Sequence, residues 1–112
     1  MTFMPSYSKG SVILVRFPFS DLTSAKVRPA VVVSAPHPSR DVLIVPLTSK
    51  LDRLQPGEFL MHGWQDAGLN VPSAVKRGIF TIDQDLIIRI VGSVAAEDER
   101  ELEQSLRAWL GL

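Results

Sequence analysis

The chain has 112 residues, 12 basic and 12 acidic side chains, and no cysteine. A chain of this length can build one hydrophobic core but not two, so we expect a single domain over residues 1–112. The lack of cysteine excludes disulfide scaffolds, thiol nucleophiles and thiolate metal sites. No basic segment followed by an apolar stretch opens the chain, and no apolar run reaches the roughly 18 residues of a membrane span. We therefore expect a cytoplasmic protein without a membrane partner.

The net charge of zero conceals an asymmetry along the chain. The segment from Glu97 to the end holds five acids and two bases, which leaves seven acids and ten bases in residues 1–96. This excess of positive charge is sufficient for a local basic face that would suit a nucleic acid. Charges scattered over an ordinary surface give the same totals, so this observation alone permits a nucleic-acid partner without requiring one.

Short apolar runs, rich in β-branched residues and bounded by turn-forming residues, predict strands along most of the chain. In chain order they cover residues 11–17, 30–34, 42–48, 79–82 and 86–94, with a weaker strand at 58–61. The intervening segments, such as 35–41 (APHPSRD), are too short for crossover helices, so we expect antiparallel pairing. The first three runs are apolar at consecutive positions, so both faces of these strands must be covered. A small closed antiparallel barrel, capped by a helix and by a partner subunit, meets this requirement.

The last segment, residues 97–110, predicts a helix that packs on the barrel. Its first turn is acidic and opposes the positive end of the helix dipole, although Ala95 stands where a capping side chain is usual. Apolar side chains recur at helical spacing and form one stripe, made of Leu102, Leu106, Trp109 and Leu110. We interpret Trp109 as a packing residue. The predicted fold is therefore mainly β with a C-terminal helix.

Polar and basic side chains gather at one end of the hairpin predicted from the second and third strands. Antiparallel pairing centred near Pro38 sets Arg28 opposite Thr48. These two residues then share a sheet edge with further hydrogen-bond donors, namely Lys26, Ser49 and Lys50. An arginine fork beside hydroxyl groups is a typical phosphate site. A solvated strand-end arginine next to an ordinary turn hydroxyl has the same spacing, so the residues alone leave both interpretations open.

Sequence motifs in a fixed order resemble the MazF/PemK family of toxin endoribonucleases. The resemblance covers nearly the whole chain and is carried by residues 9–21 (KGSVILVRFPFSD), 28–34 (RPAVVVS), 45–49 (VPLTS), 68–75 (GLNVPSAV), 80–83 (FTID) and 90–94 (IVGSV). It implies an SH3-like antiparallel β-barrel of the MazF/CcdB type that forms a homodimer. It also implies a sequence-specific endoribonuclease that needs no metal or other cofactor and leaves 2′,3′-cyclic phosphate and 5′-hydroxyl ends on single-stranded RNA.

The resemblance also implies roles for individual residues. The family's catalytic arginine and threonine correspond to Arg28 and Thr48. Because the 2′-hydroxyl of the RNA is the nucleophile in this chemistry, the protein has only to stabilise charge on the phosphorane, align the attack and manage two protons. Neither side chain is an obvious general base. For substrate binding we expect side chains from the neighbouring segments, namely Phe19, Lys26, Ser49, Lys50, Ser73 and Lys76.

Histidines, aromatic residues and one acid complete the set of candidates. His37 lies in the hairpin loop, at the end away from Arg28, and we expect His62 at the surface. Aromatic side chains that could stack on unpaired bases are Phe17, which equally suits the core, Phe19 and Trp64. Some family members carry a glutamate in the first loop, where this chain offers only Asp21, so no role is assigned to that residue.

The resemblance implies a second protein as partner, a cognate antitoxin whose acidic tail covers the site and with which the toxin binds DNA for autoregulation. Two other functions remain open at this point. The related CcdB family shares the fold and poisons DNA gyrase without cutting RNA, but its members lack the Arg-Pro and Thr-Ser pairs found at Arg28-Pro29 and Thr48-Ser49. The second alternative is an inactive barrel that only binds RNA or a partner protein.

Overall fold

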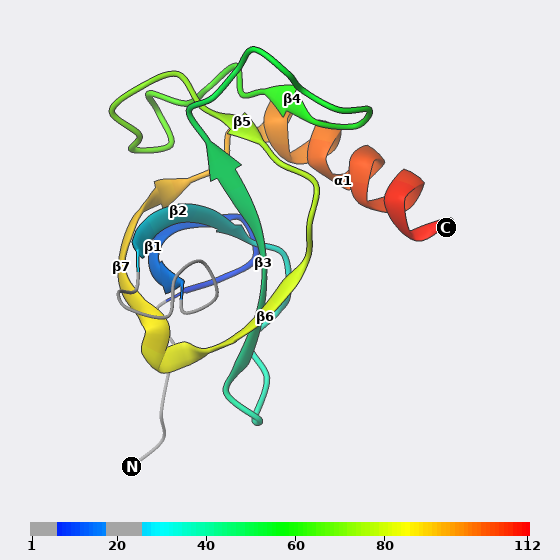
Figure 1. The fold of residues 1–112 in the computed structure, drawn as a ribbon. Helices are drawn as coiled ribbons and strands as arrows, with labels where there is room; N and C mark the ends of the chain where they lie inside the picture. Colours follow the sequence, from blue (N-terminus) through cyan, green and yellow to red (C-terminus); the bar gives the residue numbers. More distant parts are fainter. Residues whose placement is uncertain (1–6, 18–25) are drawn as a thin grey trace.

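A computed structural model describes residues 7–17 and 26–112. Within them, short strands precede one long helix (Figure 1). The elements in chain order are β1 (Ser11–Phe17), β2 (Lys26–Val32), β3 (Asp41–Thr48), β4 (Phe59–Leu60), β5 (Ala74–Val75), β6 (Phe80–Asp83), the 3-10 helix η1 (Gln84–Leu86), β7 (Ile87–Ser93) and α1 (Ala96–Leu110). The predicted mainly β fold with a C-terminal helix is confirmed. Strand β5 falls in a segment where the sequence predicted no strand.

All strand pairs are antiparallel, as predicted, and the sheet runs in the order β4-β5-β3-β2-β1-β7, with β6 paired to β3. The strands curve around a common interior (Figure 1). The expected full closure is not found, because β6 pairs only with β3 and β7 only with β1 among the described residues. The short helix η1 links these two strands and spans the gap between them.

The register of the predicted hairpin is confirmed. Ala30 faces Pro46 and Val32 faces Ile44, which is the alignment that the sequence indicated. Strand β2 begins four residues earlier than predicted because it also pairs with β1 along its whole length, as far as Lys26 opposite Phe17. The first residues of β2, which include Arg28, therefore extend beyond the end of its pairing with β3.

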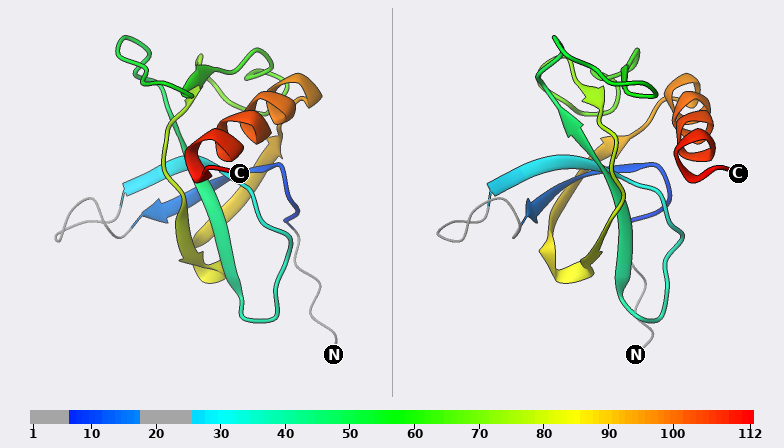
Figure 2. Two further views of the ribbon diagram at one scale, coloured as in Figure 1. Left: turned by 90° about the vertical axis from the view of Figure 1, so that its right-hand side faces the viewer. Right: turned by 45° about the vertical axis from the view of Figure 1, so that its right-hand side comes forward.

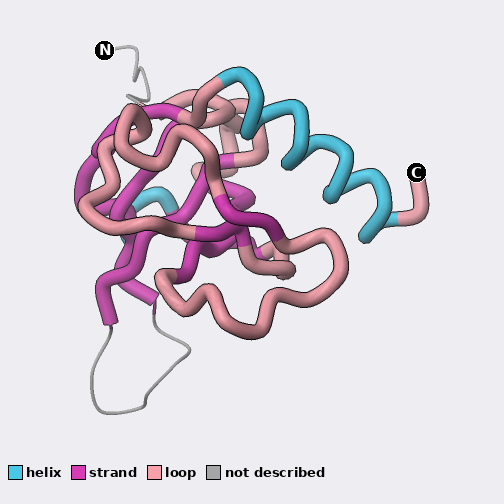
Figure 3. Tube along the Cα trace, turned by 90° about the horizontal axis from the view of Figure 1, so that it is seen from above, coloured by secondary structure: helices cyan, strands magenta, loops and turns pink. Residues whose placement is uncertain are grey.

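Two apolar clusters explain why the first strands are apolar at consecutive positions. Alternate residues of β1 point to opposite faces, so Ile13 and Val15 belong to the inner cluster in the barrel interior, while Val12 belongs with Leu102 of the helix to the outer cluster. Figures 2 and 3 show α1 on the outside of the strands, to one side of the barrel. The chain thus covers both faces of β1 itself, and a partner subunit is not required for this purpose.

Helix α1 begins one residue before the predicted start and has no side-chain cap at Ala95. Asp98 in its first turn is fully buried, and its carboxylate accepts hydrogen bonds from the backbone N–H groups of His62 (2.9 Å) and Gly63 (2.8 Å). The predicted stripe packs on the outer cluster except for Leu110, which is 56% exposed. In residues 7–17 and 26–112, no helix is long and apolar enough to cross a membrane.

Candidate functional site

The edge at which β2 begins and β3 ends carries Arg28 and Thr48. The β2–β3 ladder ends at the pair Ala30 and Pro46, two residues short of Arg28 and Thr48, and these two residues line the same two pockets. Arg28 is exposed and Thr48 is half-buried. The Thr48 hydroxyl oxygen accepts a hydrogen bond from the backbone N–H of Lys50 (3.1 Å), which leaves its own proton to donate to a ligand.

A pocket of about 380 Å³, called here the basic pocket, lies on one side of this edge. Four cationic side chains line it, and no carboxylate from the described part of the chain does so; the cations are Arg28, Lys50, Lys76 and Arg77. Glu58 supports its rim by accepting a hydrogen bond from the backbone N–H of Arg77 (2.7 Å). Such a concentration of positive charge suits the phosphates of a nucleic acid.

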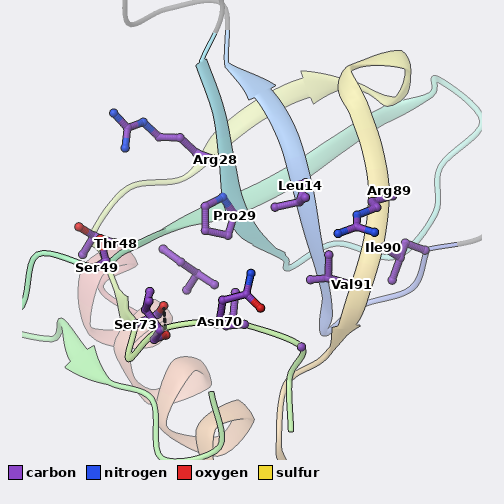
Figure 4. Close-up of a pocket in the computed structure, with 14 residues that line it drawn as sticks. Leu14, Arg28, Pro29, Thr48, Ser49, Asn70, Ser73, Arg89, Ile90 and Val91 are labelled. Carbon is purple, nitrogen blue, oxygen red and sulfur yellow. Dashed lines mark hydrogen bonds between the residues drawn. The ribbon is translucent and has the colours of Figure 1, made fainter. Parts of the chain in front are cut away.

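A second pocket, of about 430 Å³ and called here the β7 pocket, lies on the other side of the edge (Figure 4). Its floor crosses three strands in one row, because Leu14 of β1 pairs with Pro29 of β2 and with Arg89 of β7. Residues 68–71 and Ser73 form the opposite wall. The two pockets share the side chains of the edge itself, which are Arg28, Leu47, Thr48 and Ser49.

Most of the predicted site residues meet at these pockets. Arg28, Thr48 and Ser49 line both, and Lys50 and Lys76 line the basic pocket. Ser73 lines the β7 pocket, but it is buried and its hydroxyl donates to the backbone carbonyl of Val71 (2.9 Å). Lys26 is exposed at the start of β2 and lines neither pocket. Phe19 and Asp21 lie outside the described residues.

The described aromatic candidates pack in the protein, and Phe17 also lines the basic pocket. Phe17 is buried and makes an edge-to-face contact with Phe80, with ring centroids 6.0 Å apart. Trp64 packs on the outer cluster. Trp109 also packs there, as interpreted from the sequence, and its indole N–H donates to the carbonyl of Pro56 (3.3 Å).

Sequence reasoning missed Arg89, Asn70 and Phe80, all of which line one of the pockets. A signal for Arg89 was present, because it is the one charged residue in the apolar run 86–94. Asn70 and Phe80 have no comparable signal, since their positions depend on how the segments around β5 and β6 fold.

Neither histidine lines either pocket. His37 lies in the β2–β3 loop, as predicted, with its Nδ1 atom 2.8 Å from the Ser39 hydroxyl. His62 is exposed, as predicted, and its Nδ1 atom is 3.4 Å from a carboxylate oxygen of Asp98. The edge therefore offers cations and hydroxyl groups. This arrangement stabilises developing negative charge and is not suited to removing a proton.

Comparison with known proteins gives a consistent result. Residues 8–110 match the family model described as PemK-like, MazF-like toxin of type II toxin–antitoxin system. A comparison with curated proteins finds no significant match. Among solved structures, an endoribonuclease from a mycobacterial species is 23% identical with a TM-score of 0.75, and the alignment covers 99% of this chain and 97% of that one.

Two solved complexes are similar to the chain as well. An endoribonuclease with its cognate antitoxin from a mycobacterial species is 21% identical, with a TM-score of 0.75 and coverage of 96% of this chain and 97% of that one. A MazE-MazF structure from Deinococcus radiodurans is 17% identical, with a TM-score of 0.77 and coverage of 98% and 99%. At these identities the structural likeness establishes the fold.

Proposed function

Because the chain belongs to the PemK-like, MazF-like toxins of type II toxin–antitoxin systems, we propose that it is a metal-independent, sequence-specific endoribonuclease acting on single-stranded RNA. The observation that carries this proposal is the edge shared by the two pockets, where Arg28 and Thr48 meet. Both residues line the pocket on each side of the edge, so an RNA strand that crosses the edge would contact both of them. The similar mycobacterial structure is itself named an endoribonuclease.

The proposed reaction uses the substrate's own nucleophile. The 2′-oxygen of one ribose forms a bond to the adjacent phosphorus and loses its proton, while the bond from phosphorus to the 5′-oxygen breaks and that oxygen gains a proton. The products are a 2′,3′-cyclic phosphate and a 5′-hydroxyl. Negative charge increases on the non-bridging oxygens in the transition state. A preorganised donor at that position lowers the barrier.

Arg28 is the proposed donor to the non-bridging oxygens, because its planar guanidinium forms two parallel hydrogen bonds and stays charged. The Thr48 hydroxyl, whose oxygen is already held by the backbone N–H of Lys50, donates its proton to a phosphate oxygen and fixes the angle of attack. No imidazole lines the pockets, and no carboxylate of the described residues does so, so we assign proton transfer to no side chain.

The basic pocket is the proposed binding site for the phosphodiester backbone. Lys50, Lys76 and Arg77 offer sequence-independent contacts to phosphates, while Ser49 contributes a hydroxyl at the shared edge. Lys26 is exposed at the same end of β2 and is placed to meet the chain outside the pocket. Ser73 contributes by holding the wall of the β7 pocket, because its hydroxyl donates its hydrogen bond to the carbonyl of Val71 instead of to the substrate.

The proposed protein partner is a cognate antitoxin, as in the similar mycobacterial complex. An acidic segment of such a partner would compete with RNA for the four cations of the basic pocket. The expected homodimer stays a prediction. It would cover exposed apolar side chains such as Val27 and Ile88, and sedimentation at about twice the 12.4 kDa of one chain would support it. We place this activity in the cytoplasm, where RNA and antitoxin meet.

A cleavage assay on a long single-stranded RNA with EDTA present tests the proposal. We expect discrete cuts with 5′-hydroxyl ends, which are absent with Arg28→Ala purified in the same way, a result that excludes a contaminating nuclease. Arg107→Ala, on α1 and outside both pockets, should retain the cuts and controls for the loss of any arginine. Cuts that EDTA abolishes would overturn the metal-independent mechanism. No cleavage by folded protein, combined with inhibition of DNA gyrase supercoiling, would favour the CcdB-like alternative.

A further inference from the structure

The β7 pocket differs in chemistry from the basic pocket, although both border the same edge. Its floor is half-buried and mainly apolar, and includes Leu14, Pro29, Ile90 and Val91, whereas the wall and the shared edge add polar side chains. Among the described residues, the one cation that lines it apart from the shared Arg28 is Arg89. An apolar floor bordered by hydrogen-bonding side chains can hold the face of a flat heterocycle and contact its polar edge.

Two polar side chains stand over this floor without a partner. In residues 7–17 and 26–112, neither the Arg89 guanidinium nor the Asn70 amide takes part in a hydrogen bond or ion pair. Figure 4 shows both side chains directed over the pocket near Leu14. Polar groups with free hydrogen-bonding capacity above a half-buried apolar surface are what a base-binding site presents.

The pocket is also held in shape without a ligand. Gly68 has a φ of +89°, and a Cβ atom there would overlap the carbonyl of Val91 on β7. A Cβ atom at Gly92 would overlap the carbonyl of Ala67 in the same way. The wall and the floor are therefore in close backbone contact at Gly68, two residues before Asn70, and at Gly92, three residues after Arg89.

We infer that the β7 pocket binds one base of the substrate, next to the bond that is cut, and that Arg89 selects guanine there. This inference rests on the proposed ribonuclease function. An arginine fork needs two adjacent acceptors, and guanine offers them as O6 and N7 on its Hoogsteen edge. Cytosine offers O2 and N3 on its Watson–Crick edge, so a cytosine preference at this position would contradict the assignment. Adenine places a donor beside N7, and the pyrimidines have no N7. The Asn70 amide supplies a further contact at the base edge.

The test begins with a random-sequence RNA pool, in which wild-type cuts are expected to have guanine at one fixed position beside the cut. Replacing that guanine with 7-deazaguanine removes the N7 acceptor and is expected to lower kcat/KM about tenfold. Arg89→Gln should cut both substrates at equal rates. Arg107→Gln, which changes an arginine on α1, should discriminate between them as wild type does.

Three outcomes would overturn the assignment: no guanine preference beside the cut, continued discrimination by Arg89→Gln, or an equal loss of activity by Arg89→Gln on every sequence, which would make Arg89 a phosphate contact.

Failure of the ribonuclease proposal is distinguishable, because wild type would then cut no RNA. In that case, binding of short 2′-deoxy oligonucleotides decides the matter. If the oligonucleotide with guanine binds ten times more tightly than the one with adenine, and Arg89→Gln loses this difference, base binding in the β7 pocket is supported. Equal binding of the two oligonucleotides would refute it.

Discussion

The two pockets share one edge but are built in opposite ways. The basic pocket gathers exposed lysine and arginine side chains around the edge, whereas the β7 pocket rests on half-buried apolar residues of three strands and a wall in backbone contact with β7. Long charged side chains adjust to a phosphate chain, while a rigid apolar floor selects a shape. The difference suggests a division of labour in which one pocket supplies affinity and the other supplies sequence preference.

The largest expected effect comes from the edge that both pockets share. Arg28→Ala should lower the cleavage rate about 100-fold to 1000-fold, as the loss of one transition-state donor does elsewhere. Arg28→Lys keeps the charge without the fork, so we expect it to regain only part of that loss. Single-turnover kinetics on a defined RNA measure both. Equal rates for wild type and Arg28→Ala would remove Arg28 from the chemistry.

The next effect concerns the buried carboxylate in the first turn of α1. Asp98→Ala removes the carboxylate that binds the backbone N–H groups of His62 and Gly63, so the free energy of unfolding should fall by about 3 kcal/mol. Glu99→Ala is the matched control, since it also removes an acid from the first turn of α1 but is exposed, and should cost about 0.5 kcal/mol. Urea unfolding compares the two, and equal losses would contradict the role of Asp98.

The close contact between wall and floor can be tested by adding a methyl group. Gly68→Ala introduces both a strained φ and an overlap with Val91, so it should destabilise the protein by about 2 kcal/mol more than Gly111→Ala, where φ is also positive but space is open. Thermal unfolding monitors the stability. A similar loss of stability in both variants would indicate that the wall moves away from the added methyl group at no further cost in free energy.

A smaller effect is expected in the basic pocket. Arg77→Ala should weaken RNA binding to a similar extent for all sequences and reduce the slope of log affinity against log salt by about 0.7, the value for one phosphate contact on a single strand. Fluorescence anisotropy with a 2′-deoxy oligonucleotide at several salt concentrations measures this slope. Loss of binding for some sequences only would transfer sequence selection to this pocket.

For His37 we expect no effect on the cleavage rate. His37→Ala should change the cleavage rate by less than about twofold, because His37 lies in the β2–β3 loop and contacts Ser39 outside both pockets. A pH–rate profile of the variant should match that of wild type. A large decrease in rate would show that the histidine reaches the substrate in a way that the edge geometry does not account for.

Local patterns predicted those parts of the molecule in which strand pairing alone determines position. The β2–β3 register follows from hairpin geometry, so the sequence was sufficient for it, and the same geometry brings Arg28 and Thr48 to the lining of the same pockets although their predicted pairing lies beyond the end of the ladder. Strand β5, with its two residues, has no pattern of its own and exists because it pairs with β3 and β4. Asn70 was missed for the same reason, since tertiary contacts of a loop decide where it points.

The most direct test of the proposed chemistry removes the nucleophile from the substrate. Once the cleaved bond is known, an RNA with a single 2′-deoxyribose on the 5′ side of that bond should bind as tightly as the parent RNA and remain uncut there, because the attacking 2′-oxygen is missing. The matched RNA with a 2′-hydroxyl at this position should be cut. Cleavage of the deoxy-substituted bond at a comparable rate would contradict the account, since the nucleophile would then come from water or from the protein.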